Sequence, residues 1–205
     1  MRTSKIMSAL LLGCASILTT LLFSCGSPAY TRHFFVLHTA RDGTPSISKK
    51  QIILEVPRFA IDSAFASKSL VYRRSTYEYE SDFYNEFLIW PAEMITEKTR
   101  NWLAESGLFE QVVASAGQLE PTHTLIGDIK ALYGDFTEKK AATARMEIKI
   151  AVTRKEAGEV SILFSKTYTA SFQMDARNAE ALVDAFDKCL VQILAELEAN
   201  LARKL

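Results

Sequence analysis

The sequence has little proline and glycine, and it carries no excess charge of either sign. Five prolines and eight glycines occur in 205 residues, and no low-complexity run or internal repeat is present. Basic and acidic residues number 24 each. This balance lacks the basic excess that nucleic-acid binding requires, so we expect no nucleic-acid partner. Hydrophobic residues make up 48% of the chain, enough to form the core of one domain, with or without an appendage.

Catalytic templates are also absent. The chain contains no Gly-x-Ser-x-Gly elbow, no Gly-x-x-x-x-Gly-Lys phosphate loop, no Cys-x-x-Cys pair and no His-Glu-x-x-His motif. Its three histidines are scattered. His33 and His38 are five apart on an expected strand, which points them to opposite faces and suits chelation poorly. We therefore expect a protein without enzymatic activity, cofactor or bound metal.

The N-terminus carries the strongest signal in the sequence. Met1–Lys5 is short and basic, and residues 6–23 are almost wholly apolar. A basic start, an apolar stretch and a small residue before a cleavage point are typical of an export signal. Leu22 lies three positions before Cys25, a pattern that looks like a lipobox, in which the cysteine is acylated and becomes the first mature residue. Phe23 departs from the small or aliphatic residue that is usual at its position.

Two alternatives to acylation at Cys25 remain open. Cys14 is preceded by Leu11-Leu12-Gly13, a better local match to a lipobox, but its apolar stretch would have only about eight residues, at the short end of the usual range. Cleavage there would also leave ten mostly apolar residues on the mature chain. An uncleaved membrane helix is the other alternative, although eighteen residues is near the lower limit for spanning a bilayer. We favour Cys25, because the chain becomes polar directly after it.

Acylation at Cys25 divides the chain into three segments. We expect a signal peptide over 1–24, a lipidated tether over 25–32 and a folded domain over 33–205. A single acyl chain holds a protein only weakly, but bacterial lipoproteins resemble one another in carrying two or three on this cysteine. The anchor predicts a location in the envelope of a Gram-negative bacterium, facing the periplasm. Gly26 in place of Asp favours the outer membrane over the inner one.

Hydrophobic periodicity predicts strands and two helices in the folded domain. The expected strands are Tyr30–Thr39, Gln51–Val56, Leu70–Arg74, Tyr77–Phe83, Leu125–Tyr133, Arg145–Thr153 and Val160–Phe172, the last with Val160, Ile162, Phe164, Tyr168 and Phe172 on its dry side. The expected helices are Pro91–Ser106 and Asn178–Lys204. One wet and one dry face along the last three strands indicate an antiparallel sheet covered on one side. The predicted class is α+β, with an antiparallel sheet of about four to six strands and two helices packed on one face.

The last helix carries two polar features with no expected chemistry. Cys189 lies among apolar neighbours without a visible base or cation, which predicts a buried, inert thiol. Asp184 and Asp187 fall on its outer side, where charges usually solvate the surface.

One stretch is unusually aromatic. Seven aromatic residues occur in the nineteen positions from 72 to 90, far above the 10% average of the chain: Tyr72, Tyr77, Tyr79, Phe83, Tyr84, Phe87 and Trp90. Acidic residues are interleaved with them. Two interpretations stay open: the aromatics fill the core between sheet and helix, or they form a contact surface for a protein partner.

The same region carries a family resemblance. The segments are Leu70–Ser75, Tyr77–Phe87, Pro91–Thr96 and Trp102–Phe109. Their order is Tyr-Arg, an aromatic and acidic stretch, a helix, and a small-Gly-aromatic segment. It resembles that of the ABC-type transport auxiliary lipoprotein family, which includes the lipoprotein of paraquat-inducible (PqiC-like) systems. The resemblance covers most of the mature chain, although the later strands and the last helix match only in pattern.

The resemblance implies a small, non-enzymatic α/β lipoprotein of the periplasm. Its implied partner is an MCE-type periplasmic protein, the substrate-binding part of an ABC transporter for lipid or another hydrophobic compound. Acyl chains on Cys25 would supply the membrane contact, and a homo-oligomer stays open. A second class of function also remains open, a structural or assembly lipoprotein for an outer-membrane protein or envelope scaffold, because fold does not determine function.

Overall fold

The structure is a computed structural model that describes residues 31–47, 49–115, 117, 119–138, 141–156 and 158–205. The expected signal peptide over 1–24, Cys25 and tether residues 26–30 lie outside the described residues. The domain forms one compact unit, Arg32–Leu205.

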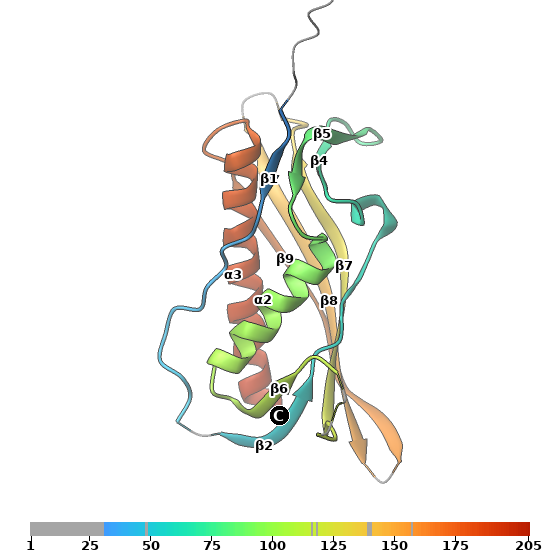
Figure 1. The fold of residues 1–205 in the computed structure, drawn as a ribbon, viewed down its shortest axis with the longest axis vertical. Helices are drawn as coiled ribbons and strands as arrows, with labels where there is room; N and C mark the ends of the chain where they lie inside the picture. The colour runs from blue at the N-terminus through green and yellow to red at the C-terminus, as the bar shows by residue number, and fades with distance from the viewer. Residues whose placement is uncertain (1–30, 48, 116, 118, 139–140, 157) are drawn as a thin grey trace, which may run out of the picture. The chain divides into compact units, whose positions relative to one another are not determined.

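The described elements are mostly strands (Figure 1). They are β1 (His33–Phe35), β2 (Lys50–Glu55), β3 (Ala60–Ile61), the 3₁₀ turn η1 (Ser63–Phe65), β4 (Ser69–Arg73), β5 (Tyr79–Phe87), α2 (Pro91–Glu105), β6 (Phe109–Val113), β7 (His123–Asp135), β8 (Thr143–Glu156), β9 (Glu159–Gln173) and α3 (Ala179–Lys204). Helix α2 lies between β5 and β6 in the chain, and α3 follows β9.

The α+β class is confirmed, but the sheet is larger than predicted and it is mixed. Nine strands of the described chain form one sheet with β7 at its centre. β7, β8 and β9 pair antiparallel, as do β4 and β5. However, β1 runs parallel to β5, β2 to β6, and β2, β3 and β4 to β7. Alternation along one strand shows which face is buried but not the direction of its neighbour, so an all-antiparallel sheet was the wrong prediction.

The three long strands follow the predicted alternation over most of their length. On β8, Met146, Ile148 and Ile150 are buried, whereas Arg145 and Glu147 lie on the opposite face. α3 packs along β8 and β9 on the dry side (Figure 1). Asn178 caps α3 as predicted, since its side chain accepts a hydrogen bond from the Ala181 amide at 2.8 Å.

The predicted faces are wrong at the start of β9. Val160 and Ile162 are 67% and 70% exposed, although alternation placed both on the dry side. Phe164 pairs with Val152, but Ile162 pairs with Thr153, so β9 contains one extra residue at a β-bulge. The extra residue reverses the side on which every earlier residue of the strand points.

β1 is much shorter than the predicted strand, because side chains bind the amides that follow it. The Leu37 amide donates to Met94 Sδ at 3.3 Å. The amides of His38 and Thr39 donate to the two oxygens of Asp187 at 3.0 and 2.8 Å. The sequence predicted that Asp187 only solvates the outer side of the helix. This prediction is wrong, because Asp187 holds the segment after β1 against α3.

The same segment is joined to both helices by Glu198. Arg41 donates from Nε and Nη2 to the Glu198 carboxylate at 2.9 and 2.8 Å. Trp102 on α2 donates from Nε1 to the same carboxylate at 2.7 Å. Hydrogen bonding to Arg41 lowers the pKa of Glu198, and this outweighs burial, which acts in the opposite direction. The Glu198 carboxylate on α3 thus links this helix to α2 and to the segment that follows β1.

Helix α2 has the predicted start and end. Pro91 is its first residue, and Ile95 and Leu103 are fully buried. Gly107 follows the helix with φ of 68°, a conformation that suits glycine and stops the helix.

Replacing Gly127 with alanine is expected to destabilise the domain by about 1–3 kcal/mol, because the new methyl group overpacks the core. A Cβ at Gly127 would lie 2.5 Å from the ring of Phe59, which is itself 1% exposed. Urea unfolding measures the change. Gly117→Ala is the control, because nothing lies within 4 Å of its added Cβ. Equal stability of the two variants would contradict the prediction.

Candidate functional site

The tertiary structure separates the seven predicted contact aromatics into buried and exposed groups. Tyr72 and Phe87 are 7% and 2% exposed and belong to the core. The others are exposed: Tyr77 (95%), Tyr79 (47%), Phe83 (63%), Tyr84 (37%) and Trp90 (49%). The core interpretation therefore holds for two of the seven, and five remain accessible to a partner.

Tyr79 differs from the other exposed aromatics because it packs against a second small cluster. Its ring lies 5.5 Å from that of Tyr133 and 6.3 Å from that of Phe65, edge-on in both cases. The rings of Phe65 and Tyr133 stack at 5.9 Å. Tyr133 pairs with the exposed Arg145 of β8, so the cluster lies on the face of β7 away from α3. Packing in this cluster leaves Tyr79 only 47% exposed.

Asp82 organises the aromatic hairpin, although the sequence showed it only as one of several interleaved acids. Its Oδ1 accepts the amides of Tyr84 and Asn85 at 2.8 and 2.9 Å. Its Oδ2 accepts the Tyr72 hydroxyl at 2.6 Å and the Asn85 side-chain amide at 2.8 Å. Burial would raise the pKa of Asp82, but the hydrogen bonds donated by Tyr72 and Asn85 outweigh it, so the pKa is lowered. Asp82 is therefore a carboxylate that holds the backbone rather than a free acid.

The Asp82 interactions produce an irregularity in the β4–β5 ladder that turns two aromatics outward. Ser69 pairs with Glu86 and Val71 pairs with Ser81, so β5 places residues 82–85 opposite a single residue of β4. Phe83 and Tyr84 lie in this excess length, with their rings edge to face at 5.3 Å. The Arg32 guanidinium covers Phe83 at 4.6 Å from the ring centroid. The local fold thus presents two aromatic side chains in a defined arrangement.

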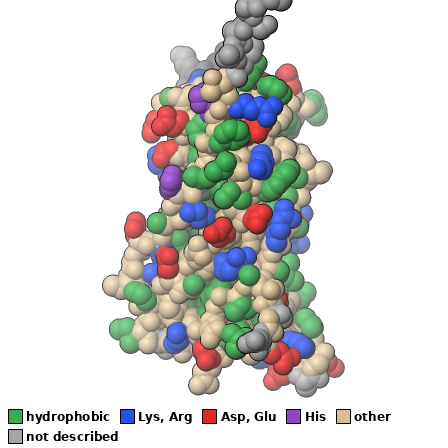
Figure 2. Space-filling model, viewed as in Figure 1, with side chains coloured by type: hydrophobic (Ala, Val, Ile, Leu, Met, Phe, Trp, Pro, Cys, Tyr) green, Lys and Arg blue, Asp and Glu red, His purple; other side chains and the backbone are tan. Residues whose placement is uncertain are grey.

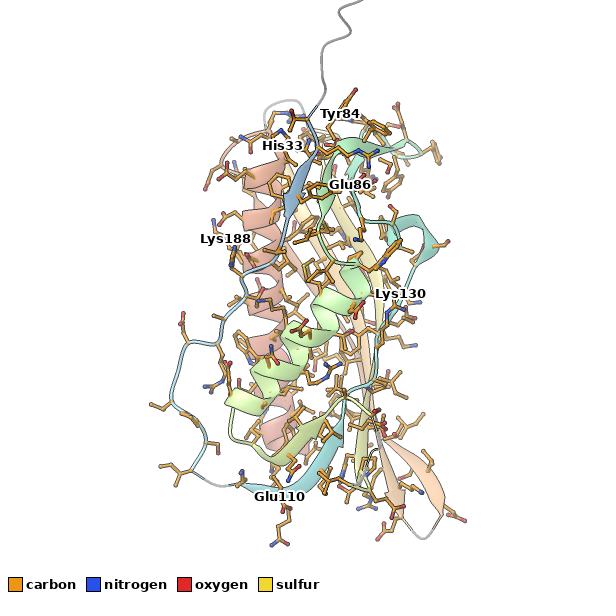
Figure 3. All side chains as sticks on the ribbon, viewed as in Figure 1. His33, Tyr84, Glu86, Glu110, Lys130 and Lys188 are labelled. Atoms are coloured by element: carbon orange, nitrogen blue, oxygen red, sulfur yellow. The ribbon has the colours of Figure 1, made fainter. Side chains whose placement is uncertain are left out.

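A groove of about 830 Å³ lies beside these aromatics. Its walls come from β1, β4, β5, Phe136 after β7, and the start of α3. His33, the first residue of β1, and Tyr84, in the middle of β5, lie near each other at one end of the domain (Figure 3). The groove is therefore formed by segments far apart in sequence at the end of the domain where the chain enters it.

Two arginines line the groove in addition to the aromatics. The guanidiniums of Arg74 and Arg177 lie 5.1 and 4.6 Å from the centroid of the Phe136 ring. Arg74 Nε also pairs with Glu80 at 2.6 Å, and Arg177 Nη1 donates to the Glu138 carbonyl at 3.0 Å. The sequence did not indicate Phe136 or Arg177, because neither lies near the aromatic stretch. Within the described ranges, no three His, Cys, Asp or Glu residues are grouped so as to hold a metal ion.

An exposed apolar patch lies next to the aromatic hairpin. We define it by Phe34, Leu88, Ile89 and Trp90, of which the sequence indicated only Trp90. Phe34 pairs with Glu86 on the neighbouring strand, and the Leu88 amide donates to the Phe35 carbonyl at 2.8 Å. Hydrophobic side chains gather on this face over β1 and the end of β5 (Figure 2).

Cys189 is buried, as predicted. Burial raises the pKa of its thiol to about 12, so the thiolate needed for reactivity does not form near neutral pH. In the part of the chain that the structure describes, no helix combines the length and the apolar character needed to cross a membrane.

Comparison with known proteins identifies a shared fold. No protein-family model matches the chain, and no curated protein matches it. The crystal structure of a DUF330 protein from Xanthomonas campestris is similar, with a TM-score of 0.69 and 16% identity over 84% of this chain and 93% of that chain. An uncharacterized protein of solved structure gives a TM-score of 0.57 and 17% identity over 84% of this chain and 97% of its own. At these identities the likeness concerns the fold alone, and the function has to be argued from the residues of this chain.

Proposed function

We propose that this chain is the membrane-anchored lipoprotein component of an MCE-type ABC transport system, which moves lipid or another hydrophobic compound across the cell envelope. Acyl chains on Cys25 hold it to the membrane, with the outer membrane favoured, and its domain faces the periplasm. It acts by protein–protein contact with the MCE-type protein, without catalysis and without a cofactor.

The observation that carries this proposal is the position of the exposed aromatics relative to the attachment point. Arg32, the first residue of the compact domain, is seven residues from Cys25, so a fully extended tether reaches at most about 25 Å. Arg32 covers Phe83, and His33 lines the same groove as Phe83 and Tyr84. The aromatic surface thus surrounds the residue at which the chain enters the compact domain. In this proposal, the short tether keeps that surface within reach of the membrane.

The chemistry of this surface suits a protein partner. Aromatic side chains are enriched at the centre of protein interfaces, where they supply contact area at a small entropic cost. The hydrogen bonds to Asp82 fix the backbone of Tyr84 before any partner arrives. Tyr77, at the turn between β4 and β5, is 95% exposed and extends the surface.

Replacing Tyr84 with alanine is expected to reduce recovery of the MCE-type protein at least about tenfold, the loss expected for an aromatic at the centre of an interface. The measurement is affinity purification of the intact lipoprotein, followed by mass spectrometry of its partners. The melting temperature is expected to stay within about 2 °C of the wild type, because the Tyr84 side chain is exposed rather than part of the core.

Ile162→Ala is the matched control, because Ile162 is an exposed apolar residue on the β8–β9 hairpin, outside the groove. It is expected to keep full recovery. Unchanged recovery with Tyr84→Ala would count against this contact surface, and a parallel fall in melting temperature would assign Tyr84 to packing. Recovery of an outer-membrane barrel alone would favour a structural or assembly role instead.

A further inference from the structure

We infer that the patch of Phe34, Leu88, Ile89 and Trp90 contacts the lipid surface of the bilayer that holds the acyl chains. The domain would then touch the membrane through its own side chains as well as through Cys25. This inference rests on the proposed acylation of Cys25, and it assigns Trp90 to lipid rather than to the protein partner.

The patch is unusual for a surface exposed only to water. Leu88, Ile89 and Trp90 are consecutive in the loop between β5 and α2 and are 54%, 36% and 49% exposed. Phe34, on the neighbouring strand, is 54% exposed. Single exposed apolar residues are common, but three consecutive large ones beside a fourth indicate a surface that is covered in use.

The loop is held in place by its backbone rather than loosely packed. The Leu88 amide donates to the Phe35 carbonyl, and Lys68 Nζ donates to the Leu88 carbonyl at 2.7 Å. The Trp90 carbonyl accepts the Met94 amide at 3.0 Å in the first turn of α2. The apolar side chains therefore project outward from a backbone that is bonded on both sides, and the patch exists before its occupant arrives.

The residue types suit the interface between lipid headgroups and acyl chains. Tryptophan is enriched at that depth because its ring is apolar while its N–H stays polar. The Lys68 ammonium lies 5.6 Å from the centroid of the Trp90 ring, whereas Arg32, which lies over Phe83, is paired with Glu86 at 3.5 Å. Basic side chains beside apolar ones match lipid phosphates beside acyl chains.

The length of the tether favours lipid over another occupant. Phe34 is nine residues from Cys25, so the patch lies within about 32 Å of the acylated residue along the chain. The tether keeps the bilayer at a high effective concentration near the patch, so a small apolar surface can remain bound without large intrinsic affinity. A soluble partner has no comparable restriction to this surface.

The natural tryptophans allow a direct test in the acylated, full-length mature protein. Trp90 is 49% exposed, whereas Trp102 is 5% exposed and bonded to Glu198. The protein is reconstituted into phosphatidylethanolamine and phosphatidylglycerol vesicles that contain phosphatidylcholine brominated on its acyl chains. We expect the emission of Trp90 to shift to the blue and to be mostly quenched by the brominated lipid. The Trp90→Phe variant should lose the quenchable part of the emission and keep the unquenched emission of Trp102.

A matched pair of variants tests the whole patch. Leu88→Glu is expected to abolish the quenching of Trp90, whereas Ile162→Glu, at an even more exposed apolar residue of the β8–β9 hairpin, should leave it unchanged. Phe34→Ser is a second patch variant, and it should also reduce quenching if Leu88→Glu fails to fold.

Vesicle flotation separates the failure of this inference from the failure of the proposed function. Protein that floats with the vesicles while Trp90 stays unquenched overturns the lipid contact and leaves the acyl anchor intact. Protein that does not float overturns both. A blue shift of Trp90 that depends on protein concentration, without bromine quenching, would assign the patch to a second copy of the chain and overturn the inference.

Discussion

Replacing Cys25 with serine is expected to abolish incorporation of a clickable palmitate analogue and to prevent processing of the chain at this position. The thiol is the acylated group, and the serine hydroxyl does not replace it. Cys14→Ser is the matched control, because Cys14 has a similar apolar approach and should keep full labelling. Labelling in growing cells, followed by gel fluorescence of the purified protein, measures both variants.

Each alternative to acylation at Cys25 gives a different result in this experiment. Loss of label in Cys14→Ser but not in Cys25→Ser would move the anchor to Cys14. Absence of label in the wild type, together with release of the protein by osmotic shock, would remove the lipid anchor altogether. A wild type that is unlabelled yet stays in the membrane fraction would indicate an uncleaved N-terminal helix. Acylation at Cys25 survives only the expected pattern. The proposed function is overturned by release of the protein, because every proposed contact depends on a domain held at the bilayer.

Replacing Glu198 with leucine is expected to lower the free energy of unfolding by about 3 kcal/mol, the loss expected when one partner of a largely buried ion pair is removed. Arg41 would lose its carboxylate partner while its side chain is only 9% exposed, and the indole N–H of Trp102 would lose its acceptor. Urea unfolding at pH 7 measures the change. An effect below 0.5 kcal/mol, as is common for surface ion pairs, would show that the linkage adds little stability.

The Glu198→Gln variant tests the charge separately from the shape. Because the pKa of Glu198 is lower in the folded protein than its ordinary value of 4.5, the carboxylate stabilises the fold above pH 4.5. This stabilisation is lost as the pH falls through the lowered pKa of the folded state. The difference in stability between wild type and Glu198→Gln should therefore be full at pH 7 and shrink below pH 4.5. A difference that stays constant with pH would show that the charge of Glu198 has no role.

The helices and the long strands could be predicted because local periodicity dictates them. Met146, Ile148 and Ile150 alternate with charged residues, and this pattern suits a strand with one dry face. Pro91 and Asn178 mark the starts of the two helices through their own chemistry, one by its fixed φ and the other by its side-chain cap. Such signals act within a few residues, so one sequence is enough to find them.

The errors arose where a distant residue decides the local structure. β1 ends at Phe35 because Met94 and Asp187, far along the chain, bind the next amides. At the start of β9, the side chains point to the opposite faces from those predicted, because β9 has one extra residue relative to β8. The parallel pairings place strands from the first half of the domain beside β7, and alternation carries no information about a neighbour's direction.

The candidate site shows the same division between local and distant information. Its aromatic stretch was evident from composition, but residues of the same type differ in burial. Phe87 lies 6.2 Å from the Phe186 ring of α3 and is buried, whereas Phe83, in the irregular part of β5, remains exposed. The apolar patch needed Phe34 from β1, more than fifty positions from Leu88.

Local sequence was enough to locate the helices, the long strands and the aromatic stretch. The acylation hypothesis at Cys25 also comes from sequence alone, because Cys25 lies outside the described residues. The exposure of each aromatic, the walls of the groove and the members of the apolar patch depend on the folded arrangement of the chain. The physical reason is that periodicity and capping act over a few residues, whereas burial depends on which distant elements the chain folds against.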